Sequence, residues 1–233
     1  MTQNSNLPAA IIFDMDGVLV DSSPFHLRKW ADFMRRHGIP VDEEALPGIV
    51  LGPANDKIFR RFLGDHLTRA QVSELGEELD AIFREEIGPN PPALPGVRRL
   101  IEEIHSQGIV MAVASAAIAS NVKFLIDALG LRGYFRQTLA VDSTTHPKPH
   151  PEIYLKTAKM LGVDPANCLV FEDSFVGIEA AKRAGMKCIA ITSTFPEEDL
   201  RRETHADLIV SSFETVTLQT VRQLFNGTGP TPL

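Results

Sequence analysis

The chain has 233 residues, of which 44% are hydrophobic and 23% are charged, a balance typical of a globular protein with one large domain or two smaller ones. Its net charge of -7 argues against nucleic acid or an anionic membrane surface as the main partner. The polar start of the chain is unlike a signal peptide, and no apolar run reaches the length of a membrane span. Cys168 and Cys188 lie within apolar runs, as reduced thiols of cytosolic proteins do. We therefore predict a cytoplasmic protein.

The first structured stretch is a short apolar run, residues 9–13, which predicts a strand buried on both faces. Asp14 and Asp16 follow it two positions apart, so an extended chain directs both carboxylates to one side. Gly17 then permits a sharp turn. Two close carboxylates repel each other unless a cation offsets their charge, and a set of oxygen ligands favours Mg²⁺. The pattern therefore predicts a metal site, and the alternative is an Asx turn that caps the strand.

Residues 20–88 contain helical patterns and no strand-like run. The apolar spacing and the capping residues predict helices over residues 23–38, 42–46, 55–63 and 68–87, with Thr68 as the N-cap of the last. Two glycine- and proline-rich turns are present, one at residues 47–55 and one at 88–92, and the second is a stiff return linker. We therefore predict an inserted α-helical domain, residues 20–92.

From Leu94 onward strand and helix patterns alternate. Strands are predicted over residues 109–114, 138–141, 168–171, 187–191 and 208–210, and helices over 96–107, 120–129, 151–161 and 176–184. Such alternation predicts an α/β fold with a doubly wound, Rossmann-like parallel sheet, here formed by residues 1–19 and 93–233. Ligands of such sheets bind beyond the carboxyl ends of the strands.

Polar side chains follow several of these predicted strands. Ser115 comes directly after residues 109–114, where a hydroxyl and free backbone N–H groups can hold phosphate oxygens. Glu172 and Asp173 follow residues 168–171 and add two carboxylates at the same edge as Asp14. The sequence therefore predicts that these acidic side chains converge with Ser115 in one crevice.

A lysine lies in a proline-rich loop, HPKPHP, beyond the predicted strand 138–141. The prolines lower the entropic cost of holding Lys148 in one direction, and its charge can offset that of a phosphoryl group and of Asp14. His146 and His150 flank this lysine, and we expect them to be structural or rim residues rather than metal ligands.

Four segments resemble, in order, the motifs of the haloacid dehalogenase superfamily, in its phosphotransferase branch. They are DMDGVLVDS from Asp14, the strand end at Ser115, KPHPEIY from Lys148, and FEDSFVGIEAAKRAGM from Phe171. Ala116 departs from the asparagine that commonly follows the second motif's Ser or Thr. The helical insert is similar to the small cap of the subgroup related to β-phosphoglucomutase and phosphoglycolate phosphatase. The resemblance thus implies a core domain with an inserted cap.

The resemblance also implies a role for each matched residue. Asp14 would be the nucleophile that forms an aspartyl phosphate, and Asp16 the group that gives and takes the proton. Ser115, Ala116 and Lys148 would bind the phosphoryl group. Mg²⁺ would be held by Asp14, by the backbone carbonyl of Asp16, and by Glu172 and Asp173, with Asp173 as a direct ligand and Glu172 in an outer position. His26, in the segment FHLRKW, would contact substrate from the cap, or would simply pack on the surface of its helix.

We therefore expect a Mg²⁺-dependent phosphatase, a monomer or weak homo-oligomer, that acts on a small phosphorylated metabolite. One alternative is a hexose-phosphate mutase similar to β-phosphoglucomutase, which must also bind a second, distal phosphate. Ala117, Ile118 and Leu51 occupy positions where mutases have phosphate-binding side chains, and Lys57, Arg60 or Arg61 are the available substitutes. A further alternative is a binding protein on an inactive phosphatase scaffold, although the residues for catalysis are present.

Overall fold

The computed structural model describes residues 7–50 and 55–226. The chain divides into two compact units, one formed by Met1–Asp21 and Pro92–Leu233 and the other by Ser22–Pro91. The second unit lies one or two residues inside the predicted insert, residues 20–92. Leu51, part of the predicted turn 47–55 and the last residues of the chain lie outside the described residues.

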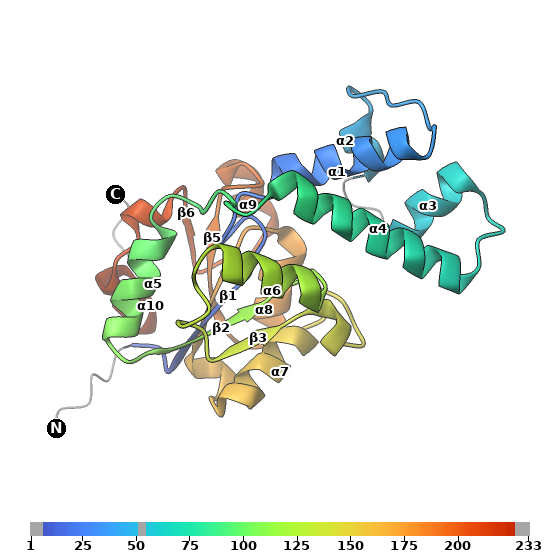
Figure 1. Cartoon of the computed structure of the whole chain (residues 1–233). Helices are drawn as coiled ribbons and strands as arrows, with labels where there is room; N and C mark the ends of the chain where they lie inside the picture. Colours follow the sequence, from blue (N-terminus) through green and yellow to red (C-terminus); the bar gives the residue numbers. More distant parts are fainter. Residues whose placement is uncertain (1–6, 51–54, 227–233) are drawn as a thin grey trace. The chain divides into compact units, whose positions relative to one another are not determined.

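The larger unit is built on a six-stranded sheet in the order β3-β2-β1-β4-β5-β6 (Figure 1). Each strand runs parallel to its neighbours, and β1 lies at the centre. The predicted α/β fold with a doubly wound parallel sheet is therefore confirmed. The strands are β1 (Ala10–Phe13), β2 (Val110–Ala114), β3 (Gln137–Leu139), β4 (Cys168–Glu172), β5 (Lys187–Ile191) and β6 (Leu208–Val210).

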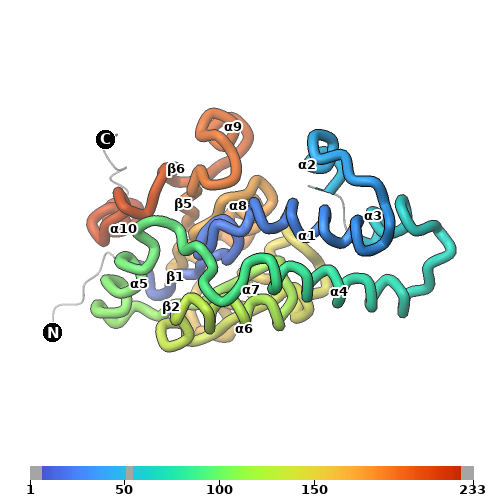
Figure 2. The backbone as a smooth tube through the Cα atoms, turned by 45° about the horizontal axis from the view of Figure 1, so that its top comes forward, coloured from blue at the N-terminus to red at the C-terminus, as the bar shows by residue number. Residues whose placement is uncertain are grey.

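Helices cover both faces of this sheet. They are α5 (Val97–Ser106), α6 (Ala119–Ala128), α7 (Glu152–Leu161), α8 (Phe175–Arg183), α9 (Glu197–Glu203) and α10 (Leu218–Asn226). The connections through α5 and α6 run from β1 toward β3, whereas those through α7, α8 and α9 run from β3 toward β6. Because parallel crossovers are right-handed, the first pair covers one face of the sheet and the other three helices cover the opposite face. Figures 1 and 2 both show α10 beside α5.

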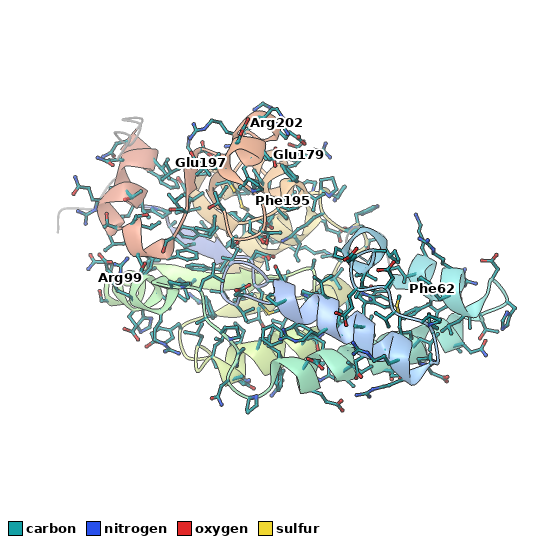
Figure 3. The ribbon with its side chains drawn as sticks, turned by 90° about the horizontal axis from the view of Figure 1, so that it is seen from above. Phe62, Arg99, Glu179, Phe195, Glu197 and Arg202 are labelled. Carbon is teal, nitrogen blue, oxygen red and sulfur yellow. The ribbon has the colours of Figure 1, made fainter. Side chains whose placement is uncertain are left out.

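Each face of the sheet has its own apolar core. On the α7–α8 face, Ile12, Val170 and Ile178 belong to one buried cluster. On the other face, the ring of Phe171 lies 5.1 Å from that of Phe13 and 5.2 Å from that of Phe213. The short helix η3 (Phe213–Thr215) is fixed to α5 by Arg99, labelled in Figure 3, which donates to the carbonyls of Phe213 and Val216. Two short helices, η1 (Val141–Ser143) and η2 (Pro165–Asn167), complete this unit.

The described residues of the smaller unit form helices joined by turns and loops. Its helices are α1 (Ser23–Arg36), α2 (Leu46–Val50), α3 (Asn55–Leu63) and α4 (Arg69–Ile87). Trp30 and Phe33 of α1 pack on Phe59 of α3, and Phe62, labelled in Figure 3, borders the same cluster. Thr68 caps α4 in a capping box with Gln71, as its position in the sequence predicts. No helix among the described residues is long and apolar enough to cross a membrane.

Some predicted elements are misplaced. The helix predicted over residues 42–46 begins only at Leu46, as α2. Before it, the Asp42 carboxylate accepts hydrogen bonds from the backbone N–H groups of Glu44 and Ala45 and forms a turn. The predicted strand 138–141 ends at Leu139, and Val141 begins η1. The sequence analysis did not predict α9 or α10.

Candidate active site

The sheet register brings the first acidic motif beside the last. In the parallel pair β1–β4, Phe13 is opposite Phe171, and the backbone N–H of Asp14 donates to the carbonyl of Phe171 at 3.0 Å. The next residues on the two strands are therefore Asp14 and Glu172, both buried at the carboxyl edge of the sheet. Neighbouring parallel strands thus account for the convergence of two motifs that are far apart in the sequence.

Lys148 links these two carboxylates. Its Nζ atom lies 2.6 Å from Asp14 Oδ1 and 2.6 Å from Glu172 Oε1, and 3.4 Å from the carbonyl oxygen of Ala114. Burial alone would lower the pKa of Lys148, but the two carboxylates outweigh it and raise that pKa. The ammonium group is therefore charged and is directed at the proposed nucleophile.

Hydrogen bonds occupy both oxygens of Glu172. Oε2 accepts from the N–H of Asp173 at 3.0 Å, from the N–H of Ser174 at 3.1 Å and from its hydroxyl at 3.0 Å. Oε1 accepts from Tyr154 at 2.7 Å as well as from Lys148. Burial tends to raise the pKa of Glu172, and Lys148 and these donors lower it below its usual value. Glu172 is thus an anion that orients Lys148, an arrangement that suits an outer position better than direct metal ligation.

Asp173 lies against the loop that follows β1. The hydroxyl of Thr194 donates to its Oδ2, and Gly17 has a φ of 72°. A Cβ atom at Gly17 would lie 1.8 Å from Asp173 Oδ2, so only glycine permits this approach. Burial and the charge of Glu172 raise the pKa of Asp173 to about 7. Without a cation this carboxyl therefore holds its proton more tightly than an exposed aspartate does.

These acidic side chains fit a hard divalent cation. One oxygen from each of Asp14, Glu172 and Asp173 lies within 4.8 Å of the others, and all three side chains are buried. Burial and the charges of the two other carboxylates raise the pKa of Asp14 although Lys148 opposes this. The positive charge of Lys148 is too small to balance three buried carboxylates, and a divalent cation would offset the excess negative charge. Carboxylate oxygens are also the ligands that Mg²⁺ prefers.

Asp16, the fourth predicted metal residue, does not belong to this group of three oxygens. It forms an isolated parallel bridge with Val20, and its charge contributes to the raised pKa of Asp173. The structure therefore places Asp16 close enough to Asp173 for their charges to interact, although its carboxylate is not among the three oxygens that lie within 4.8 Å of one another.

Ser115 is fully buried directly after β2, where its N–H donates to the carbonyl of Leu139 at 2.9 Å and its Oγ accepts from the N–H of Ala117 at 3.0 Å. Ala116 between them is exposed. The helix α6 then begins at Ala119, whose N–H donates to both carboxylate oxygens of Asp142 at 3.1 and 3.2 Å. The carboxylate of Asp142 thus already offsets the partial positive charge at the N-terminus of α6.

His26 lies in the helical unit, where its ring stacks on Phe83 with the centroids 4.9 Å apart. The structure accounts for His26 by this packing. Its predicted contact with substrate remains a prediction, since the residues gathered around Asp14 all belong to the other unit.

The sequence analysis missed several residues of this site. One is Tyr154, whose hydroxyl donates to Glu172. Tyr154 is the last residue of the segment KPHPEIY, so its position in that motif was an available signal. Ser193 and Thr194 follow β5, so the rule used for Ser115, that polar residues after a strand face the site, would have found them. Ser193 donates to the carbonyl of Gly17 at 2.5 Å. Gly177 lies so close to the carboxylate of Glu172 that a Cβ atom would not fit there, and this closeness gives no comparable signal in a sequence.

Comparison with known proteins identifies the family. A family model of haloacid dehalogenase-like hydrolases matches residues 8–185. The probable phosphatase IndB of Dickeya dadantii is 31% identical, with 88% of this chain and 90% of that protein covered. In Escherichia coli, fructose-1-phosphate phosphatase YqaB is 30% identical (78% and 96% covered), and hexitol phosphatase B is 32% identical (89% and 94% covered).

Solved structures agree with these matches. A family IA, variant 3 haloacid dehalogenase hydrolase from Entamoeba histolytica superposes with a TM-score of 0.85 at 27% identity, covering 93% of this chain and 99% of that one. A β-phosphoglucomutase from Clostridium difficile gives a TM-score of 0.78 at 27% identity, covering 95% and 98%. The predicted resemblance and the predicted enzyme class, a phosphatase of this family, are confirmed. The chain belongs to the haloacid dehalogenase-like hydrolases.

Proposed function

We propose that the protein is a Mg²⁺-dependent phosphatase that hydrolyses a small phosphorylated sugar or sugar alcohol through an aspartyl phosphate on Asp14. The observation that carries this proposal is the buried chain of contacts from Asp14 through Lys148 to Glu172. It presents a carboxylate beside a fixed positive charge, which is what attack on a phosphate ester requires.

The reaction proceeds in two displacements. In the first, an Asp14 oxygen attacks phosphorus, the O–P bond to the substrate alcohol breaks, and the departing oxygen takes a proton from Asp16. In the second, Asp16 removes a proton from water as the water oxygen attacks phosphorus. The bond between Asp14 and phosphorus then breaks, inorganic phosphate leaves, and both carboxyl groups return to their initial states.

Positive charge and hydrogen bonds stabilise the phosphoryl oxygens as charge moves between them. Lys148 supplies a fixed ammonium, and Ser115 is proposed to supply its hydroxyl as a further donor. Asp14 and Asp173 would hold Mg²⁺, with Glu172 in an outer position and Asp16 as the remaining predicted ligand. When bound, the ion would offset negative charge on the phosphoryl oxygens and on Asp14.

The proposed substrate class has two supports. Two of the phosphatase relatives carry names that refer to fructose 1-phosphate and to hexitols. In addition, residues 116–119 have only alanine and isoleucine side chains, and the carboxylate of Asp142 occupies the N-terminus of α6. A carboxylate there repels a second phosphate, so a monophosphate with an uncharged remainder suits the site better than a bisphosphate.

The carboxylate of Asp142 at the start of α6 also argues against the mutase alternative. Because the chain is similar to a β-phosphoglucomutase, that alternative needs a direct test. A mutase must hold a distal phosphate and transfer the phosphoryl group to a sugar hydroxyl. A phosphatase transfers it to water, so reaction in ¹⁸O-labelled water should label the released phosphate. Conversion of β-glucose 1-phosphate to glucose 6-phosphate faster than phosphate release, with a requirement for glucose 1,6-bisphosphate, would establish the mutase instead.

The proposal is tested by replacing the nucleophile. Asp14→Asn keeps the shape of the side chain and removes its charge, so turnover of fructose 1-phosphate and sorbitol 6-phosphate should fall by roughly 10³-fold or more. Asp164→Asn is the matched control, because Asp164 caps η2 before the amino end of β4, away from the carboxyl edge. Both proteins should give the circular dichroism of the wild type. An Asp14→Asn protein that turns over at the rate of the control would refute the mechanism.

A further inference from the structure

A second group of potential metal ligands lies on the loop that carries Lys148. Its segment runs from His146 to Glu152 and contains three prolines, which restrict the backbone. The N–H of His150 donates to the carbonyl of Pro147 at 3.0 Å and closes a turn around the lysine. His146 and His150 are exposed, whereas the Lys148 side chain between them in sequence is buried in the candidate active site.

The two histidines converge on Glu152, the first residue of α7. Their rings stack with centroids 4.5 Å apart and an interplanar angle of 30°. His146 Nδ1 lies 3.0 Å from Glu152 Oε2, and His150 Nδ1 accepts from the N–H of Glu152 at 3.3 Å. One ligand atom from each of the three residues lies within 4.8 Å of the others. Both Nδ1 atoms therefore face the same residue, and a small ion could reach them together.

The separations suit a transition metal. Two ligands bound at about 2.1 Å and at right angles to each other are about 3.0 Å apart, which is the observed separation of His146 Nδ1 and Glu152 Oε2. The metal replaces the proton between these atoms, and that proton moves to His146 Nε2, so the imidazole stays neutral. His150 Nδ1 is unprotonated, since it accepts from the N–H of Glu152, and the metal would displace this long hydrogen bond of 3.3 Å. Lys156 and the N–H of Thr145 bind the other carboxylate oxygen, Oε1, at 2.6 and 3.0 Å. Oε2 accepts from the backbone N–H of His146 at 2.9 Å, and its second lone pair is the one that would bind the metal.

We propose that His146, His150 and Glu152 bind one first-row transition metal ion, such as Zn²⁺. This ion would reduce the mobility of the loop that positions Lys148. Two imidazoles and one carboxylate favour Zn²⁺, Co²⁺, Ni²⁺ or Cu²⁺, whereas Mg²⁺ prefers sites of oxygen ligands. The group is thereby distinct in chemistry from the three buried carboxylates around Asp14. Metal binding here does not depend on the proposed phosphatase activity.

Zn²⁺ binding to the full-length protein, purified without a histidine tag, tests this site. Isothermal titration calorimetry is carried out in excess Mg²⁺, which competes for the carboxylates around Asp14. Wild-type protein should bind one equivalent of Zn²⁺, and His146→Ala and His150→Ala should each weaken binding at least about tenfold, as loss of one ligand implies. His205→Ala, which removes another exposed histidine of the same unit, should bind as the wild type does.

A second measurement reports on the loop itself. Hydrogen exchange followed by mass spectrometry should show slower exchange over residues 144–152 when Zn²⁺ is added to the wild type, and no such change in His150→Ala. Absence of Zn²⁺ binding in the wild type would overturn the proposal. Binding that both histidine variants retain, or that excess Mg²⁺ abolishes, would assign the ion to the carboxylates around Asp14 and would equally overturn it.

Discussion

Glycine at two positions decides whether the acidic side chains can approach their neighbours. Gly17 allows the loop after β1 to lie against Asp173, and Gly177 allows the first turn of α8 to lie against the carboxylate of Glu172. A Cβ atom at Gly177 would lie 1.7 Å from Glu172 Oε1, far inside van der Waals contact. The position of Glu172, and through it that of Lys148, therefore depends on the absence of a side chain at Gly177.

Replacing Gly177 should accordingly reduce catalysis. In Gly177→Ala, Glu172 or α8 must move, and a displaced Glu172 loses its present hydrogen bond from Lys148. We expect kcat to fall by about tenfold or more, and the free energy of unfolding to fall by roughly 1–3 kcal/mol from overpacking. Steady-state kinetics on fructose 1-phosphate and urea unfolding measure the two effects.

Gly76→Ala provides the matched control. Gly76 lies within α4, and a Cβ atom there would meet no heavy atom within 4 Å. Alanine in an open helical position should raise the stability by roughly 0.5–1 kcal/mol and leave kcat unchanged. Equal kcat values for the two alanine variants would show that Glu172 does not need its present position.

Single residues of the site were predictable where a motif or a strand end marked them. Asp14, Lys148 and Asp173 come together as the order of motifs and the logic of a parallel sheet predict. The saturation of Glu172 by five hydrogen bonds, including one from Tyr154, depends on packing between β4 and α7 and leaves no pattern in the sequence.

At the scale of elements, Asp207 joins α8 to the strands β5 and β6. Its carboxylate accepts from Lys182 at 2.5 Å, from Lys187 at 3.0 Å and from the N–H of Cys188 at 2.8 Å. Burial alone would raise the pKa of Asp207, but the hydrogen bonds from Lys182, Cys188 and Lys187 outweigh it and lower that pKa. The charged form of Asp207 therefore stabilises the edge of the sheet.

This contribution should depend on pH in one direction. Because the folded pKa lies below the unfolded value of about 3.9, the stabilisation is present above pH 4 and is lost as the pH falls through the folded pKa. Asp207→Asn should lower the free energy of unfolding by about 1–2 kcal/mol at pH 7 and by less near pH 2–3. Urea unfolding at both pH values measures this, and a deficit that is the same at both would contradict the assigned role of the charge.

Elements with strong apolar patterns were predicted well, and those with weak patterns were not. The apolar runs of β4 and β5 are unambiguous because both faces of these strands are buried. Helix α9 buries only Leu200, so its sequence shows no helical stripe. Helix α10 does bury Leu218, Val221 and Leu224 at helical spacing, and that signal was present but not used.

At the scale of the whole molecule, the change from helical patterns to alternating strands and helices predicted two units. The parallel sheet then accounts for how residues 134 positions apart, Asp14 and Lys148, form one ion pair. Their separation could not be predicted from the sequence, because it depends on where the proline-rich loop returns to the edge of the sheet. The two units and the sheet thus follow from hydrophobic patterns in the sequence, whereas the distances between the side chains of the site do not.

Chemical trapping of the aspartyl phosphate tests the proposed mechanism at its defining step. Borohydride reduces an acyl phosphate and would convert a phosphorylated aspartate to homoserine, which mass spectrometry of the digested protein locates. With fructose 1-phosphate and Mg²⁺ present during turnover, we predict homoserine at position 14, dependent on both additions and absent from Asp14→Asn. Homoserine at a different aspartate, or an unmodified Asp14 in enzyme that was trapped during rapid turnover, would contradict the assignment of Asp14 as the nucleophile.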